Sequence, residues 1–343
     1  MSARSLKKSD VKQFIGKIIA AGDTAAPVIG PGGFYRLRLV TDPDDVSMEG
    51  KYLYYSAKEF VFPGVESLVR YTLKEPVDIE PVVDKRSITL LGLHPCDINA
   101  LWMMDAAFDD DPDLRDDNYC AKRERLTIIG FDCAEPCDDD SFCADMDCHR
   151  VRGDYDLMLV DVGDSYLVHV GSEKGGKLVE DLPEASRNEI SSADAADRAK
   201  DDKFERKLSF DSSELPGRLS ERHNDKALWE ESAKNCFSCG SCNLVCPTCY
   251  CFDVFDDLAL DVSGAERKRR WDGCQLEAFA MVAGGENFRP ERSERLRHRL
   301  MRKGKYLIEK FGRPGCVGCG RCIRACTADI SILEVFNKLN EGA

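Results

Sequence analysis

The chain has 343 residues, of which 43% are hydrophobic and 32% are charged, and its formal net charge is −14. This length predicts roughly two domains, and the composition excludes a disordered chain, a collagen-like repeat and a general nucleic-acid binder. The chain contains 17 cysteines, and a chain of this length can fold around a core without disulfides, so the thiols indicate metal binding.

Membrane and secretion signals are not evident in the sequence. No apolar run approaches the length of a membrane span, and Asp10, Lys12 and Lys17 interrupt the apolar segment near the N-terminus. We therefore expect a cytoplasmic protein, where thiols stay reduced. Acidic residues dominate the first 225 residues, whereas basic residues slightly outnumber them afterwards, and this asymmetry indicates separate domains.

The predicted architecture is α+β in three parts, residues 1–171, 172–225 and 226–343. The first part is expected to be an α/β domain, because short apolar runs alternate with a helical pattern over 98–108 that has Asp97 as its N-cap. A turn at 162–164 predicts a hairpin between the last two strands. The expected strands are 35–40, 87–93, 126–131, 157–162 and 165–170.

The rest of the chain reads as helical. Residues 172–225 are polar and predict a helical or loose linker, with a docking segment as the alternative. Beyond them we expect an all-α domain without strands. Its predicted helices are 252–260, 274–283, 291–311 and 328–339.

One cysteine motif occurs twice in that domain, with the spacing C-x2-C-x2-C-x3-C of bacterial ferredoxins. In two-cluster proteins the fourth cysteine of each motif ligates the other cluster. Gly240 and Gly320 hold equivalent places, where backbone N–H groups can approach cluster sulfur. We therefore expect one 4Fe–4S cluster on Cys236, Cys239, Cys242 and Cys326, and a second on Cys316, Cys319, Cys322 and Cys246.

The long segment between the motifs separates this chain from compact ferredoxins and predicts the helical ferredoxin fold instead. Basic residues concentrate at 266–271 and 295–303. They predict either solvated helix faces or a docking surface, for an acidic partner or for the acidic N-terminal domain of the same chain. No motif supports nucleic-acid binding.

A third cluster is predicted in the N-terminal domain. Two of its cysteines follow neighbouring predicted strands, and the carboxyl ends of parallel strands share one edge of the sheet. We expect the ligands Cys96, Cys133, Cys137 and Cys143, with Cys148 as a competitor and structural zinc or scattered free thiols as the alternatives. Cys120 reads as a surface thiol, and Cys249, Cys251 and Cys274 as buried thiols or part of another metal centre.

These motifs resemble a known family. CFSCGSCNLVCPTCYCFDV, RKRRWDGC, AGGENFR and GCVGCGRC, together with SAKEFVFPGVESL and HPCDINAL, are similar to segments of two related proteins. These are the iron–sulfur beta subunit of cytoplasmic NiFe hydrogenases (sulfhydrogenases) and its counterpart in anaerobic sulfite reductase. The chain departs from the family at Ser141, where relatives often have cysteine. If that cysteine is a ligand there, Cys137 or Cys148 must replace it here.

The resemblance implies an electron-transfer subunit of a hetero-oligomer rather than an independent enzyme. It implies a flavin- or NAD(P)-linked redox partner, a catalytic partner and an N-terminal cluster as well as the paired ones. The negative charge of the N-terminal domain predicts a lowered reduction potential for the cluster in that domain. Two alternatives remain open: a redox enzyme with its own flavin, for which GPGGF at 30–34 is weak evidence, or with a reactive thiol, and a zinc-stapled interaction protein.

Overall fold

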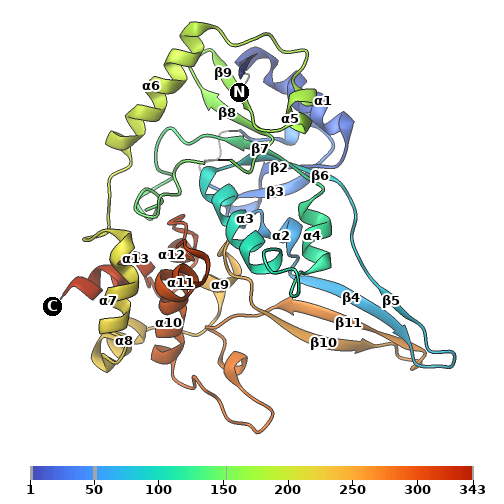
Figure 1. The fold of residues 1–343 in the computed structure, drawn as a ribbon, viewed down its shortest axis with the longest axis vertical. Helices are drawn as coiled ribbons and strands as arrows, with labels where there is room; N and C mark the ends of the chain where they lie inside the picture. Colours follow the sequence, from blue (N-terminus) through green and yellow to red (C-terminus); the bar gives the residue numbers. More distant parts are fainter. Residues whose placement is uncertain (1–2, 49–51, 152, 342–343) are drawn as a thin grey trace.

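A seven-stranded mixed sheet organises the N-terminal half of the chain (Figure 1). The computed structural model describes residues 3–48, 52–151 and 153–341. The strand order is β1-β9-β8-β7-β6-β2-β3, with β2, β6, β7 and β8 parallel and the outer pairings antiparallel. All five predicted strands are present, and β1 and β2 are additional. The strands are β1 (Ala3–Lys7), β2 (Thr24–Ile29), β3 (Tyr35–Val40), β6 (Ile88–Leu93), β7 (Leu126–Phe131), β8 (Leu157–Asp161) and β9 (Ser165–Val170).

A hydrophobic core covers each face of this sheet at its central strands, whose successive residues point to opposite sides. Leu90 packs into one core with helices α3 (Pro95–Phe108) and α4 (Asp117–Arg123), whereas Leu91 packs into the other with α1 (Val11–Ala21). Helix α3 begins three residues earlier than predicted. Pro95 supplies its first turn and His94 is its N-cap, so the predicted cap at Asp97 is wrong.

Residues 172–225 contain three helices, α5 (Glu173–Leu178), α6 (Arg187–Lys203) and α7 (Leu215–Glu221). A capping box between Ser186 and Glu189 begins α6. At its other end Lys200 is buried and forms an ion pair with Asp132, the residue before Cys133. Helix α6 therefore supports the end of strand β7, where the third set of cysteines begins.

The C-terminal part is a set of short helices around a separate core. Trp229, Leu300 and Phe336 are buried at its centre, and Phe142 and Met146 of the N-terminal part pack into the same core. The predicted helix 291–311 is present with a π-helical turn inside it. The helices are α8 (Lys226–Ala233), α9 (Ser241–Leu244), α10 (Arg292–Met301), the π turn Arg302–Tyr306, α11 (Leu307–Phe311), α12 (Arg321–Arg324) and α13 (Ile332–Asn337).

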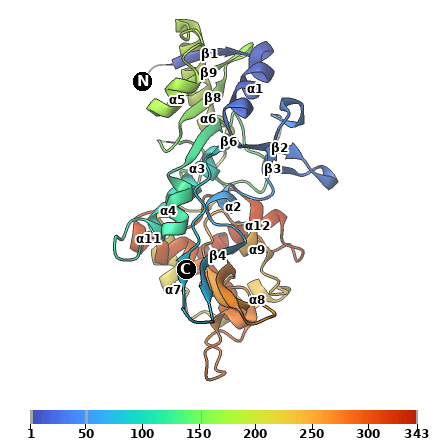
Figure 2. The same ribbon diagram turned by 90° about the vertical axis from the view of Figure 1, so that its right-hand side faces the viewer.

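The expectation of an all-α C-terminal domain is wrong for residues 252–271. These residues form a hairpin of β10 (Phe252–Leu258) and β11 (Gly264–Trp271), which joins β4 (Val65–Thr72) and β5 (Ile79–Pro81) in a second sheet. The sheet extends away from the helices (Figures 1 and 2). The predicted helix 274–283 is also wrong, since it is reduced to a 3₁₀ turn at Glu277–Ala280.

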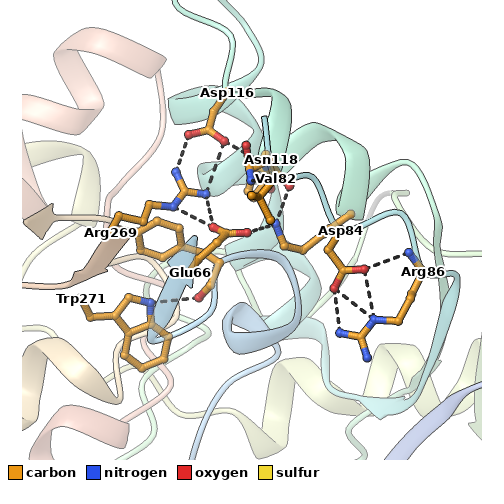
Figure 3. A network of polar contacts seen from close by, with 11 residues as sticks. Glu66, Val82, Asp84, Arg86, Asp116, Asn118, Arg269 and Trp271 are labelled. Carbon is orange, nitrogen blue, oxygen red and sulfur yellow. Dashed lines mark hydrogen bonds and ion pairs between the residues drawn. The ribbon is translucent and has the colours of Figure 1, made fainter. Parts of the chain in front are cut away.

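A buried network of charges anchors this second sheet to the N-terminal domain (Figure 3). Arg269 of β11 has 1% of its side chain exposed and bonds Glu66 of β4 and Asp116 at the start of α4. Glu66 also pairs with the buried Lys122 of α4, and Trp271 donates a hydrogen bond to the carbonyl oxygen of Phe62. The hairpin is therefore fixed to the N-terminal domain by both strand pairing and interior ion pairs.

No helix in the described part of the chain is long and apolar enough to span a membrane.

Glu66 provides a test of this anchorage. The substitution Glu66→Gln leaves Arg269 and Lys122 buried with less compensating charge, so we expect the free energy of unfolding to fall by about 3–5 kcal/mol. Chemical denaturation of the anaerobically purified chain, followed by circular dichroism, measures this change. Glu80→Gln on the exposed strand β5 is the matched control. Equal effects of the two substitutions would contradict an energetic role for the network.

Candidate metal centres

The two cysteine motifs adopt the same backbone conformation. Ser238 and Gly318 occupy equivalent positions with φ of 55° and 65°, and Gly240 and Gly320 follow with φ of 76° and 71°. In each loop the N–H of the first of these residues lies 3.4 Å from the sulfur of the leading cysteine, Cys236 or Cys316. Such turns let several thiols and N–H groups face one centre, as iron–sulfur ligation requires.

The first motif shares a cavity with the last cysteine of the second. Cys236, Cys239 and Cys242 line this cavity together with Cys326, as the predicted exchange of the fourth cysteine requires. Cys322 reaches the same wall, and Leu296, Leu300, Ile330 and Ile332 make the surroundings apolar. Burial raises the pKa of Cys242 to about 12, so its thiolate is costly here without a metal.

The second motif gathers with Cys246. The sulfur of Cys246 lies 3.3 Å from the Thr248 hydroxyl, which donates to the carbonyl oxygen of Gly315, the residue before Cys316. Burial raises the pKa of Cys319, and the thiols of Cys246 and Cys322 act in the same direction. Cys316 faces Cys322 and Cys319 in the same way. The short helices α9 and α12, which follow the two motifs, pack against each other and bring the two sets side by side.

The third set lies where the sequence predicted it, at the carboxyl edge of two parallel strands. Cys96 is in the first turn of α3 after β6, and Cys133 follows β7, which pairs with β6 in parallel. Both line one cavity with Cys137 and Cys143. Burial raises the pKa of Cys137 to about 11 and that of Cys143 to about 12. Cys148 lines the same cavity and remains a competing donor.

The second motif is docked directly on this third set. Phe142 donates its N–H to the carbonyl oxygen of Gly318 at 2.8 Å, and a Cβ at Gly318 would overlap the carbonyl oxygen of Phe142. Arg324 pairs with Asp138 at 2.8 Å, and Cys319 lines the cavity of the third set. The three cysteine sets therefore form a row, with the second motif and Cys246 in the middle.

Buried cations are the functional feature that the sequence interpretation missed. Arg295, Arg299 and Lys303 have 5%, 3% and 3% of their surface exposed, so segment 295–303 is neither a solvated face nor a free docking surface at these positions. Their spacing of four residues, which places them on one face of a helix, is the signal that could have identified them. Arg321 is also buried, between Cys319 and Cys96, and pairs with Asp97 at 2.8 Å.

The other basic segment, 266–271, lies on strand β11 and not on a helix. Its exposed residues pair with the aspartates of β10, and Arg269 enters the acidic N-terminal domain of the same chain. The expectation of an intramolecular contact is thus confirmed for Arg269. The pairs across the hairpin are Arg267–Asp256, Lys268–Asp257 and Arg270–Asp253.

Apart from Cys148, four cysteines lie outside the predicted ligand sets. Cys120, on the buried face of α4, is 3% exposed, so its interpretation as a surface thiol is wrong. The sulfurs of Cys249 and Cys274 each lie 3.6 Å from the Asn243 amide nitrogen, and Cys251 neighbours Cys274. These last three thiols pack together behind Cys246.

Comparison with known proteins identifies the C-terminal part. Residues 235–330 match the family model described as a 4Fe–4S dicluster domain. This segment is a 4Fe–4S dicluster domain. Over 334 residues the chain is 28% identical to Sulfhydrogenase 2 subunit beta of Pyrococcus furiosus, and the alignment covers 96% of both chains. The resemblance to iron–sulfur beta subunits is therefore confirmed, as is the expectation of 4Fe–4S clusters.

The residues of the dicluster domain fit these clusters. Thiolate sulfur is their natural ligand, and N–H groups directed at the ligand sulfurs stabilise their negative charge. Ser238, Gly318 and Ile330 supply such N–H groups at 3.3–3.4 Å from cysteine sulfur. When bound, the clusters supply one-electron redox chemistry, while the chain holds them, excludes water and sets their electrostatic surroundings.

Gly318 tests the docking of the second motif. We expect Gly318→Ala to destabilise the protein by about 1–3 kcal/mol more than Gly312→Ala, because its Cβ enters the Phe142 backbone. Gly312 is the matched control, since it has φ of 75° and open space around its Cβ position. Denaturation midpoints and iron content measure the difference. Two equally stable variants would show that the contact does not constrain the loop.

Proposed function

We propose that the protein is an iron–sulfur subunit that relays single electrons through three 4Fe–4S clusters. Its two partners are a flavin- or NAD(P)-linked redox protein and the catalytic subunit of a cytoplasmic oxidoreductase of the hydrogenase or sulfite-reductase type. The observation that carries the proposal is the row of three cysteine sets, in which Cys319 of the middle set also lines the cavity of the third. A chain of adjacent redox centres is useful only between an electron donor and an acceptor.

The proposed ligands keep the exchange of fourth cysteines. Cys326 lines the cavity of the first motif, and Cys246 contacts Thr248, which donates to Gly315 at the start of the second motif, and both observations support the exchange. The N-terminal cluster uses the four predicted cysteines, all of which line one cavity at the carboxyl edge of the sheet. The assignment is therefore Cys236, Cys239, Cys242 and Cys326 for the first cluster, Cys316, Cys319, Cys322 and Cys246 for the second, and Cys96, Cys133, Cys137 and Cys143 for the third.

The two ends of the row differ in their surroundings. At the first cluster Cys239 is exposed and the neighbouring Phe237 has 71% of its surface exposed, so a partner can approach closely. The third set lies at the edge of the N-terminal sheet, on the other side of the middle set. This polarity suits a protein that lies between two partners in a hetero-oligomer. The relative's name, a hydrogenase beta subunit, supports the same conclusion.

The structure disfavours the alternative of a flavin held by GPGGF. Residues 30–34 join the antiparallel strands β2 and β3, and Gly32 and Gly33 have φ of 81° and 77°. This is a turn between two strands, whereas a dinucleotide-binding loop connects a strand to the N-terminus of a helix. A tightly bound flavin in the purified chain would contradict the relay in its simple form.

Metal analysis of the anaerobically purified chain tests the proposal as a whole. Three clusters predict about twelve iron atoms and as many acid-labile sulfides per chain, with broad visible absorption that bleaches on reduction. A measured content of about eight iron atoms per chain would exclude only the N-terminal cluster from the proposal. Several equivalents of zinc without iron would overturn the proposal in favour of a zinc-stapled interaction protein.

Cys143 tests the N-terminal cluster. We expect Cys143→Ser to lower the iron content by about a third, because one of three clusters loses a ligand. Cys120→Ser is the control, since this thiol is buried in the same domain but lines none of the cavities described above. If Cys143→Ser keeps all its iron while Cys148→Ser loses a third, Cys148 is the ligand and the assignment is wrong at that position.

Paired substitutions test the exchange of fourth cysteines. Under the assignment, Cys246→Ser combined with Cys319→Ser damages one cluster and removes about four iron atoms, whereas Cys246→Ser combined with Cys239→Ser damages two and removes about eight. Without the exchange the two results would be reversed. Each single variant, with a loss of about four iron atoms, provides the reference.

A further inference from the structure

Three basic residues recur at every fourth position along α10 and the π turn that follows it. Arg295, Arg299 and Lys303 are all buried, and together they run from the first cysteine set to the middle one. Arg295 donates hydrogen bonds to Ser238 of the first motif and to two backbone carbonyl groups. Arg299 and Lys303 lie deeper, between the two motifs.

Arg299 and Lys303, like the buried Arg295 and Lys58, differ from the cations that are held by carboxylates. Arg269, Lys200 and Arg321 each form an ion pair with a carboxylate. No ion pair joins Arg299 or Lys303 to a carboxylate anywhere in the described ranges. Arg299 donates to the carbonyl oxygen of Cys242 at 3.3 Å, and Lys303 donates to the hydroxyl oxygen of Thr248 at 2.6 Å.

The groups that face these two cations are cysteine thiols. The nearby groups that raise the pKa of Arg299 are the thiols of Cys242 in the first set, of Cys322 and Cys246 in the middle set, and of Cys249. Lys303 is linked to the middle set by two contacts. The Thr248 hydroxyl that accepts from Lys303 lies 3.3 Å from the sulfur of Cys246, and Gly315, the residue before Cys316, donates its N–H to the carbonyl oxygen of Lys303 at 2.8 Å. Placing two charges in an interior without anions is very unfavourable, so the sites need negative charge that the protein itself does not supply.

The segment that carries Lys303 is built for this position. A π-helical turn at Arg302–Tyr306 inserts one extra residue into the helix and changes the direction of the side chains that follow, a distortion frequent at functional sites. A Cβ at Gly304, inside this turn, would lie 2.7 Å from Leu219, so the turn packs closely against α7. This packing and the hydrogen bond to Thr248 place Lys303 beside the middle set.

A cluster ligated by four thiolates carries negative charge, and reduction adds one more electron to it. A fixed positive charge in a region of low dielectric constant stabilises the reduced form more than the oxidised form, and so raises the potential. At the first cluster the exposed Cys239 brings water close, which weakens the effect. At the third, Asp97 and Asp132 lie beside Cys96 and Cys133, although each pairs with a cation.

Building on the proposed relay, we propose that Arg299 and Lys303 are countercharges that give the middle cluster the highest potential of the three. An electron that enters from either end then resides on the centre of the row. The two residues act on the cluster through space and ligate no iron. They determine where in the chain of clusters the electron is held.

Replacing Lys303 tests this role. We expect Lys303→Met, which keeps the length of the side chain and removes the charge, to shift the midpoint potential of the middle cluster to a more negative value. Redox titration of the full-length protein, monitored by electron paramagnetic resonance, measures the shift. Lys303→Arg restores the charge and should restore the potential. Lys310→Met, which removes the same charge from the exposed end of α11, should change nothing.

A second measurement leaves both cations unchanged. On stepwise reduction of the unmodified protein, the first signal to appear should be the one that is missing from Cys319→Ser. This experiment remains decisive if Lys303→Met does not assemble. The inference would be overturned if, in the unmodified protein, the signal that Cys319→Ser lacks appears after another cluster's signal. It would also be overturned if a fully iron-loaded Lys303→Met keeps an unshifted potential. Either result leaves the relay intact. Absence of iron from the second motif would instead overturn the proposed function.

Discussion

The arrangement of this molecule depends on one contact, the seating of the second cysteine motif against the N-terminal domain. The backbone of Gly318 meets that of Phe142 so closely that no side chain fits between them. Two ion pairs, Arg324–Asp138 and Arg321–Asp97, fix the same loop from both sides. Because the contact is made by backbone and buried charges, it defines the spacing between the dicluster domain and the third cysteine set. It turns two separate groups of thiols into a continuous row.

The second constraint is electrostatic. Thiolates and iron–sulfur clusters bring negative charge into an apolar interior, and such charge persists only where positive groups or N–H dipoles compensate it. The chain supplies both, through loops with positive φ at Ser238 and Gly318 and through Arg299 and Lys303 on the neighbouring helix. The overall charge of −14 conceals this local arrangement. The basic residues that serve the metal sites are those that solvent does not reach.

The hairpin β10–β11 has a different role. It lies between the two cysteine motifs in the sequence, yet it pairs with β4 of the N-terminal domain and places Arg269 between Glu66 and Asp116. The segment after the first motif thus returns to the domain that carries the third set. The dicluster domain is therefore tied to the same support at two places, the hairpin and the second motif, which keeps the three cysteine sets in fixed relation.

The sequence by itself determined the features that depend on local spacing. The C-x2-C-x2-C-x3-C repeats identified the dicluster domain, and alternating apolar runs identified the central strands of the sheet, because ligand loops and buried strands are encoded by residues close together in the chain. Cys96 and Cys133 could be placed at one edge because parallel neighbours share it. Only the tertiary structure decided that residues 252–258 form a strand, since their short apolar pattern suits helix and strand alike until β11 and β4 pair with it. The same holds for the basic residues. Whether an arginine on an amphipathic helix faces solvent or a cluster depends on what packs against that helix, and residues far away in the sequence decide this.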